Sequence, residues 1–153
     1  MILSSKIKVA VIGAGYMAQE HIKVFLSINE IEVVGIHSRT MSKAQSLAVQ
    51  FNIPFVAEKI TDLYEKTKAD LLIIAVSEMS VYSVAAQAFQ FPWLSLIEKP
   101  AGYNFENTLL IKELAVKKSF KPDIIFIDYL NICASSRFKG AANVNSYMYI
   151  KSI

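Results

Sequence analysis

Two patterns of apolar residues alternate along the 153-residue chain. The first is a short, nearly unbroken apolar run rich in β-branched residues, which is typical of strands covered on both faces, as in a parallel sheet. We expect five such strands, at residues 7–13, 31–36, 69–76, 94–99 and 123–130. The second pattern spaces apolar residues three or four apart, which predicts amphipathic helices between the strands.

The helical pattern recurs in three stretches. It is formed by Met17, His21, Phe25 and Ile28, by Ala44, Leu47, Ala48 and Phe51, and by Leu109, Lys112, Leu114 and Val116. We expect Ser42 to cap a helix over residues 43–51, with Pro54 following its end. Thr61-Asp62 opens a short helical turn, and Asn104 precedes the last helix.

The element order β-α-β-α-(β)-α-β-α-β-α-β predicts an α/β fold, a doubly wound parallel sheet with right-handed crossovers of the Rossmann-like class. Residues 1–130 fit a single domain of this class. Residues 131–153 break the pattern and form a divergent C-terminal tail, in which SYMYIKSI has the composition of one strand.

The segment Gly13-Ala14-Gly15-Tyr16-Met17-Ala18 directly follows the first strand and opens the first helix. In a dinucleotide site of the G-x-G-x-x-G/A kind, Gly13 permits the tight turn, Gly15 admits a pyrophosphate, and Ala18 lets the helix pack closely on the strand. The helix N-terminus then presents free N–H groups to the phosphates. The alternative is a structural turn in a domain that binds no ligand.

The end of the second strand bears on the choice between NAD and NADP. An NAD site usually places Asp or Glu there to hold the ribose hydroxyls, and this chain instead has Ser38, Arg39 and Thr40, followed by Lys43. Two cations and two hydroxyls suit a 2′-phosphate, so we expect NADP to be favoured over NAD. The alternative is a polar strand end that caps the next helix.

Composition excludes several classes of function. The chain is 54% hydrophobic and 19% charged, which is too apolar for a disordered protein, and its apolar runs are too short to cross a bilayer. The net charge of +3 is mild and dispersed, so we expect no nucleic-acid partner. One cysteine, Cys133, and two distant histidines give no metal site, and His21 and His37 fit packing or surface positions. Without a signal peptide, we expect a cytoplasmic protein.

Four segments carry a resemblance to a known family. They are VIGAGYMAQEHIKVFL, VVGIHSRTMSKAQSLAVQFNIP, ADLLIIAVSEMSVYSVAAQAF and LIEKPAGYNFENTLLIKELA. Over about residues 7–130 their order and spacing resemble the N-terminal NAD(P)-binding domain of the glucose–fructose oxidoreductase and inositol dehydrogenase (Gfo/Idh/MocA) family. The combination of the glycine turn with Glu98-Lys99-Pro100 is the specific part of this resemblance.

The resemblance implies hydride transfer between a nicotinamide and a hydroxyl of a sugar or nucleotide sugar. It implies that Lys99 is the catalytic residue, near the nicotinamide ribose and the reacting hydroxyl, and that Pro100 fixes the turn after the fifth strand. The loop at the end of the fourth strand would border the cofactor. The expected cofactor-binding residues are Gly13, Gly15, Tyr16, Met17, Ala18, Ser38, Arg39, Thr40, Lys43, Ala75, Val76, Ser77, Glu98, Lys99 and Pro100. The alternative for Lys99 is a surface lysine at a strand end.

The chain departs from the family pattern in three places. Val76-Ser77-Glu78 replaces the family's Thr-Pro-Asn, Asn131 is not followed by an arginine pair, and no segment matches the family's second, substrate-binding domain. We therefore expect a truncated relative that binds cofactor but does not turn over alone. The alternatives are a subunit completed by a partner chain and a non-catalytic cofactor-binding or regulatory module. A bare domain face would favour a homodimer or aggregation.

Overall fold

The computed structural model describes residues 6–117, which lie in the first of the two units, 1–120 and 121–153, into which the chain divides. The predicted strand at 123–130 and the tail at 131–153 lie outside the described residues. The structure therefore bears on the first five strands, the helices between them and the helix that follows.

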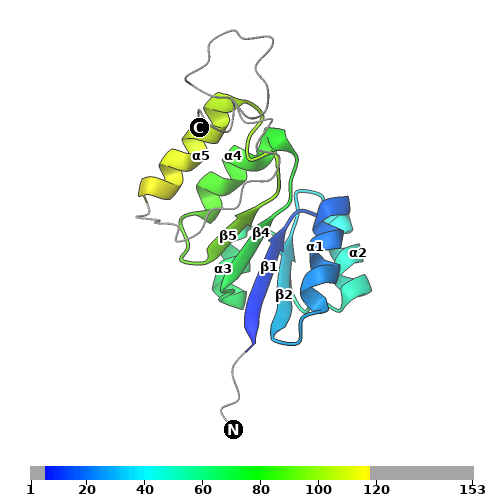
Figure 1. The fold of residues 1–153 in the computed structure, drawn as a ribbon. Helices are drawn as coiled ribbons and strands as arrows, with labels where there is room; N and C mark the ends of the chain where they lie inside the picture. Colours follow the sequence, from blue (N-terminus) through cyan, green and yellow to red (C-terminus); the bar gives the residue numbers. More distant parts are fainter. Residues whose placement is uncertain (1–5, 118–153) are drawn as a thin grey trace, which may run out of the picture. The chain divides into compact units, whose positions relative to one another are not determined.

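Strands and helices alternate throughout the described residues (Figure 1). The strands are β1 (Ile7–Ile12), β2 (Ile31–His37), β3 (Val56–Ala57), β4 (Leu71–Ile74) and β5 (Leu94–Ile97), and the helices are α1 (Tyr16–Leu26), α2 (Met41–Phe51), α3 (Ile60–Thr67), α4 (Glu78–Ala88) and α5 (Phe105–Lys117). The predicted order is confirmed up to α5. Strand ends differ most, since β4 is four residues long and the apolar run that predicted it has eight.

All five strands are parallel, in the order β3-β2-β1-β4-β5. The chain builds β1, β2 and β3 outward in one direction and then returns to place β4 on the other side of β1. The switch point of this doubly wound sheet therefore lies between β1 and β4, and ligands of such sheets bind at the carboxyl ends of the strands there.

Alternate residues of the central strands belong to two separate cores. Val9 and Val11 pack with α1 and α2, which Figure 1 shows together on one face of the sheet. Ala10 and Ile12 pack on the other face with α3, α4 and Ile111 of α5. Because β1 is covered on both faces, its sequence is apolar at every core position, which is why the run could be recognised as a strand.

The fifth strand does not share this burial. Leu94 is 65% exposed and Leu96 is 36% exposed, and the expectation of a strand covered on both faces is wrong for β5. Among the described strands β5 lies at an edge of the sheet, and a strand at an edge has a neighbour on one side only.

Two helix starts differ from those expected. Helix α2 begins at Met41 with Thr40 as its N-cap, and no side chain caps it. Ser42 lies inside the first turn, where its carbonyl oxygen accepts a hydrogen bond from the Ser46 hydroxyl, so the expected Ser42 cap is wrong. Helix α3 begins at Ile60, one residue before Thr61. Asn104 does cap α5, because its side-chain oxygen accepts the Asn107 N–H at 2.9 Å.

The apolar faces of two helices were misassigned. In α1 the buried residues are Ala18 and Ile22, whereas Met17 is 42% exposed. Ile28 lies beyond the end of α1 at Leu26 and is 39% exposed. In α5 Ile111 is buried, and Leu109 and Val116 are exposed. The face of α2 is confirmed, with Ala44, Leu47 and Ala48 buried. Within residues 6–117 we find no helix that combines the length and the apolar character needed to cross a membrane.

We predict that Gly13→Ala destabilises the fold by about 3 kcal/mol, because a side chain at this backbone geometry is strained and has no room. Gly13 has φ +123°, and an added Cβ would lie 2.0 Å from the carbonyl oxygen of Ala75. The matched control is Gly15→Ala, whose Cβ would meet nothing within 4 Å, and we expect it to cost less than about 1 kcal/mol. Urea unfolding measures both, and equal losses would contradict the prediction.

Candidate functional site

The carboxyl ends of four neighbouring strands are joined in a row by main-chain hydrogen bonds. Gly13 N donates to His37 O at 2.8 Å, Ala75 N donates to Ile12 O at 2.8 Å, and Glu98 N donates to Ile74 O at 2.9 Å. The segments that follow β2, β1, β4 and β5 are thereby held side by side at one edge of the sheet. These segments contain the residues that we expected from the sequence to bind the cofactor.

The turn after β1 is open toward solvent at one glycine and closed at the other. Gly13 is packed against Ala75, and Gly15 is the exposed N-cap of α1, with φ −91° and ψ −174°. No side chain caps α1, and its first turn contains no acidic residue. Ala18 is fully buried, as the close packing of helix on strand requires, while Tyr16 is 74% exposed and Met17 is 42% exposed. The first-turn N–H groups of α1 therefore face a region that no side-chain cap occupies.

The segment after β2 presents polar groups without a carboxylate. Ser38 Oγ accepts the Thr40 N–H at 3.2 Å, and Thr40 is the N-cap of α2. Arg39 and Lys43 are exposed. His37 was assigned to a packing or surface position, and the structure places its Nδ1 3.0 Å from the carbonyl oxygen of Ala57. Two cations and two hydroxyl groups thus follow β2 within one turn of helix.

The segment after β4 lies at the same carboxyl ends of the strands. Ala75 is buried against the glycine turn, Val76 is half-buried, and Ser77 is the exposed N-cap of α4. Ser77 Oγ lies 3.3 Å from Ser80 Oγ. Ala75 therefore lies against the glycine turn, and Val76 and Ser77 follow it, in the loop that we expected to border a ligand.

Glu98 has both carboxylate oxygens engaged. Its Oε2 lies 2.6 Å from His21 Nε2, and its Oε1 accepts the Lys99 N–H at 3.1 Å. The Lys99–Pro100 peptide bond is cis, and both residues are exposed. The segment after β5 is thus tied to α1 as well as to β4.

His21 is the residue of this site that sequence reasoning missed. It lies one turn beyond Met17 in α1, and the spacing assigned it to an apolar helix face. Its side chain is 21% exposed and that of Glu98 is 15% exposed, so the pair is largely shielded from water. The partners are 77 residues apart in sequence, and no local pattern signals a contact of that separation.

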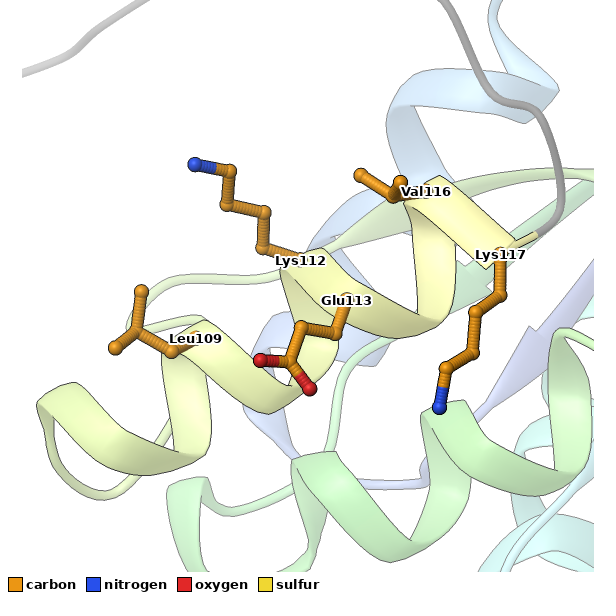
Figure 2. A pocket seen from close by; sticks show the side chains of 5 residues that line it. All are labelled: Leu109, Lys112, Glu113, Val116 and Lys117. Carbon is orange, nitrogen blue, oxygen red and sulfur yellow. The ribbon is translucent and has the colours of Figure 1, made fainter.

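A separate hollow of about 300 Å³ lies on α5 and is not part of the site at the carboxyl ends of the strands. Figure 2 shows its lining side chains projecting from α5 alone: Leu109, Lys112, Glu113, Val116 and Lys117. None of these residues is among the cofactor-binding or catalytic residues expected from the sequence. Residues 6–117 contain no group of three His, Cys, Asp or Glu side chains that could hold a metal ion.

The residues at the strand ends fit a dinucleotide. A Cβ at Gly15 would point into open space, so the backbone there is accessible to a diphosphate. The uncapped start of α1 offers N–H donors and the positive end of the helix dipole. Arg39 and Lys43 add positive charge at the neighbouring strand end.

Comparison with known proteins also indicates a dinucleotide-binding domain. The family model GFO_IDH_MocA, an oxidoreductase family with an NAD-binding Rossmann fold, matches residues 7–122. An uncharacterized oxidoreductase of Synechocystis is 27% identical over 128 residues, covering 82% of this chain and 34% of that protein. Glucose-6-phosphate 3-dehydrogenase of Bacillus subtilis is 26% identical over 132 residues, covering 84% of this chain and 37% of that protein. The chain therefore spans about a third of these curated relatives.

Two further matches are a solved structure and a short sequence match. The structure of myo-inositol dehydrogenase from Lactobacillus casei, in complex with NAD(H) and myo-inositol, has a TM-score of 0.69 and 23% identity. The match covers 76% of this chain and 35% of the dehydrogenase chain. At this identity, the match supports the fold alone. A DnaB-like replicative helicase of phage T4 is 45% identical over 56 residues, which are 35% of this chain and 12% of that protein.

We predict that His21→Leu lowers the free energy of unfolding by about 1–2 kcal/mol, because it leaves a shielded carboxylate oxygen without its donor. The control is Lys23→Leu on the same helix, which removes an exposed ion pair with Glu20 and should cost less than about 0.5 kcal/mol. A urea-unfolding cycle with Glu98→Gln measures the coupling between His21 and Glu98. Additive losses in the double variant would contradict a direct interaction.

Proposed function

The chain belongs to the Gfo/Idh/MocA oxidoreductase family, and we propose that its described domain holds the nicotinamide dinucleotide for hydride transfer to or from a sugar-type secondary alcohol. One observation carries the proposal: the glycine turn and the open start of α1 lie at the switch point, beside the ends of β2, β4 and β5. The family supports the nicotinamide chemistry, and the open geometry at the strand ends supports this position for the cofactor.

The start of α1 would bind the diphosphate. Gly15 leaves space for phosphate oxygens against the backbone, and Gly13 holds the turn close to β4. The N–H groups of the first turn donate to those oxygens, and the helix dipole favours their charge. Tyr16 and Met17 are exposed beside this position and would flank the bound diphosphate.

The segment after β2 would bind the adenosine ribose, and we propose that it prefers the 2′-phosphate of NADP. Arg39 can meet a phosphate with two parallel N–H bonds, and Lys43 adds a second cation one turn away. Ser38 and Thr40 add hydroxyl donors. The described residues of this segment include no carboxylate to hold a 2′-hydroxyl, which is the group that favours NAD.

Lys99 would act at the substrate end of the site. A bound nicotinamide dinucleotide supplies the carbon that accepts or donates hydride. Lys99 can orient the reacting hydroxyl, and its neutral amine can take up the hydroxyl proton as the alcohol becomes a ketone and return it from the resulting ammonium in the reverse direction. A sugar-type alcohol is supported by the relative named glucose-6-phosphate 3-dehydrogenase and by the inositol complex of the fold neighbour.

We further propose that residues 1–153 bind cofactor without measurable turnover on their own. Hydride transfer requires the alcohol to be held at a fixed distance and angle, which takes contacts on more than one side of it. In the described domain, Lys99 is the residue assigned to the substrate. A partner chain that supplies further contacts, or a purely regulatory use of the bound cofactor, is the alternative. Turnover of sugar alcohols by the purified chain would contradict this proposal.

The helicase match does not lead to a second function. It covers 12% of that protein, and the 153 residues contain no Gly-x-x-x-x-Gly-Lys-Ser/Thr segment, with which P-loop ATPases hold phosphates. The family model, by contrast, spans residues 7–122 and includes every residue of the candidate site.

We predict that Gly15→Val weakens binding of both NADPH and NADH at least about tenfold, because the side chain occupies the approach of the diphosphate. Folding should survive, since a Cβ at Gly15 meets no atom within 4 Å. Fluorescence titration of the reduced cofactors measures the affinities, and urea unfolding verifies the fold. Wild-type affinity in a folded Gly15→Val chain would place the diphosphate elsewhere.

We predict that NADPH binds more tightly than NADH, and that Arg39→Gln lowers the NADPH affinity about tenfold through loss of the charge-assisted pair. NADH affinity should change less than about twofold, because NADH lacks the 2′-phosphate. Lys66→Gln is the control, an exposed cation on α3 outside the proposed site. Tighter binding of NADH by the wild-type chain would refute the NADP preference.

A further inference from the structure

The contact between His21 and Glu98 joins the two ends of the proposed site. His21 belongs to α1, whose N-terminus is proposed to bind the diphosphate, and Glu98 directly precedes Lys99. The 2.6 Å separation of His21 Nε2 and Glu98 Oε2 is a short hydrogen bond. It is the contact through which a side chain of α1 reaches the segment after β5.

We propose that His21 is a positioning residue for Lys99, acting through Glu98. This inference rests on the proposed function, because it assigns His21 to the placement of a residue in that site. His21 does not itself touch substrate or cofactor in this assignment. Its role is to hold the carboxylate that holds the Lys99 backbone.

The bonds around Glu98 support this role. Glu98 N donates to Ile74 O at 2.9 Å, which fixes its backbone to β4. Its Oε1 accepts the Lys99 N–H at 3.1 Å, and its Oε2 is held by His21. A carboxylate anchored at one oxygen has little rotational freedom at the other, so the direction of the Lys99 backbone depends on the imidazole. Removing His21 leaves Oε2 to turn toward water and frees the bond to Lys99.

The position of His21 also connects cofactor binding to Lys99. A diphosphate at the start of α1 and the imidazole of His21, five residues beyond Tyr16, act on the same rigid helix. A cofactor that seats against Gly15 therefore meets Lys99 at a distance set by α1 and the His21–Glu98 bond. Without that bond the cofactor can still bind at Gly15, and the backbone N–H of Lys99 loses the fixed carboxylate that holds it toward the cofactor.

Two measurements on the full chain test the proposal. The first is amide hydrogen exchange of the Lys99 N–H without cofactor, which should quicken at least about fivefold in His21→Leu as the Glu98 bond is lost. The second is modification of Lys99 by trinitrobenzenesulfonate, followed by peptide mass spectrometry with and without NADPH. At NADPH ten times its Kd, wild-type Lys99 should be protected about tenfold, and His21→Leu should lose most of this protection while its NADPH Kd changes less than about threefold.

Two variants separate positioning from general loss of structure. His21→Gln keeps a nitrogen that can donate to Glu98, so it should restore slow exchange and protection of Lys99. Lys23→Gln removes the exposed Glu20–Lys23 pair on the same helix and should leave Lys99 as in the wild type. If His21→Leu does not fold, the comparison of His21→Gln with Glu98→Gln carries the test, since Glu98→Gln weakens the same bond from the other side.

The outcomes are distinct. Unchanged exchange and protection of Lys99 in folded His21→Leu would overturn the positioning role. Failure of His21→Gln to restore them would also overturn it, because the effect would then not pass through the hydrogen bond. Failure of the wild-type chain to bind NADPH would end the proposed function, and amide exchange would still decide whether His21 holds Lys99.

Discussion

The close approach of the turn after β1 to the end of β4 is the constraint on which the site depends. Gly13 lies so near the carbonyl of Ala75 that no other residue fits there, and its N–H is bonded to His37. This contact sets the direction in which the chain enters α1. The start of α1 therefore opens where the described strands reverse their order, between the ends of β1 and β4. A looser turn would keep the fold class and lose the convergence of these four strand ends.

The sheet could be predicted from sequence because its burial leaves a clear trace. Strands covered on both faces need apolar side chains at every buried position, so β1 from Val9 onward and β4 appear as unbroken apolar runs. The glycine turn was recognisable for a similar reason, since Gly13 is required by space and Ala18 by close packing. The strand β5 was recognised by the same composition, although Leu94 and Leu96 turned out to be exposed.

Other features could not be obtained in this way because they depend on contacts across the fold. The spacing of Met17 and His21 suggested an apolar face. The buried face of α1 instead lies one residue further along the sequence, at Ala18 and Ile22. The helix start at Met41 is set without any side-chain cap, so the hydroxyl of Ser42 gave a misleading signal. The pairing of His21 with Glu98 depends on the packing of α1 against β1, β2 and β4, which the local sequence around neither residue encodes.

The distribution of charge along the strand ends fits the two tasks of the proposed site, cofactor binding and proton transfer. The exposed cations Arg39 and Lys43 follow β2, and the carboxylate of Glu98 follows β5, where His21 shields it. In the proposed placement, a dinucleotide with its charged adenosine end at β2 has its nicotinamide ring toward β5. There a free carboxylate would compete for the ammonium of Lys99. Because the oxygens of Glu98 accept hydrogen bonds from the His21 imidazole and the Lys99 backbone N–H, this carboxylate is already engaged in the proposed arrangement of Lys99.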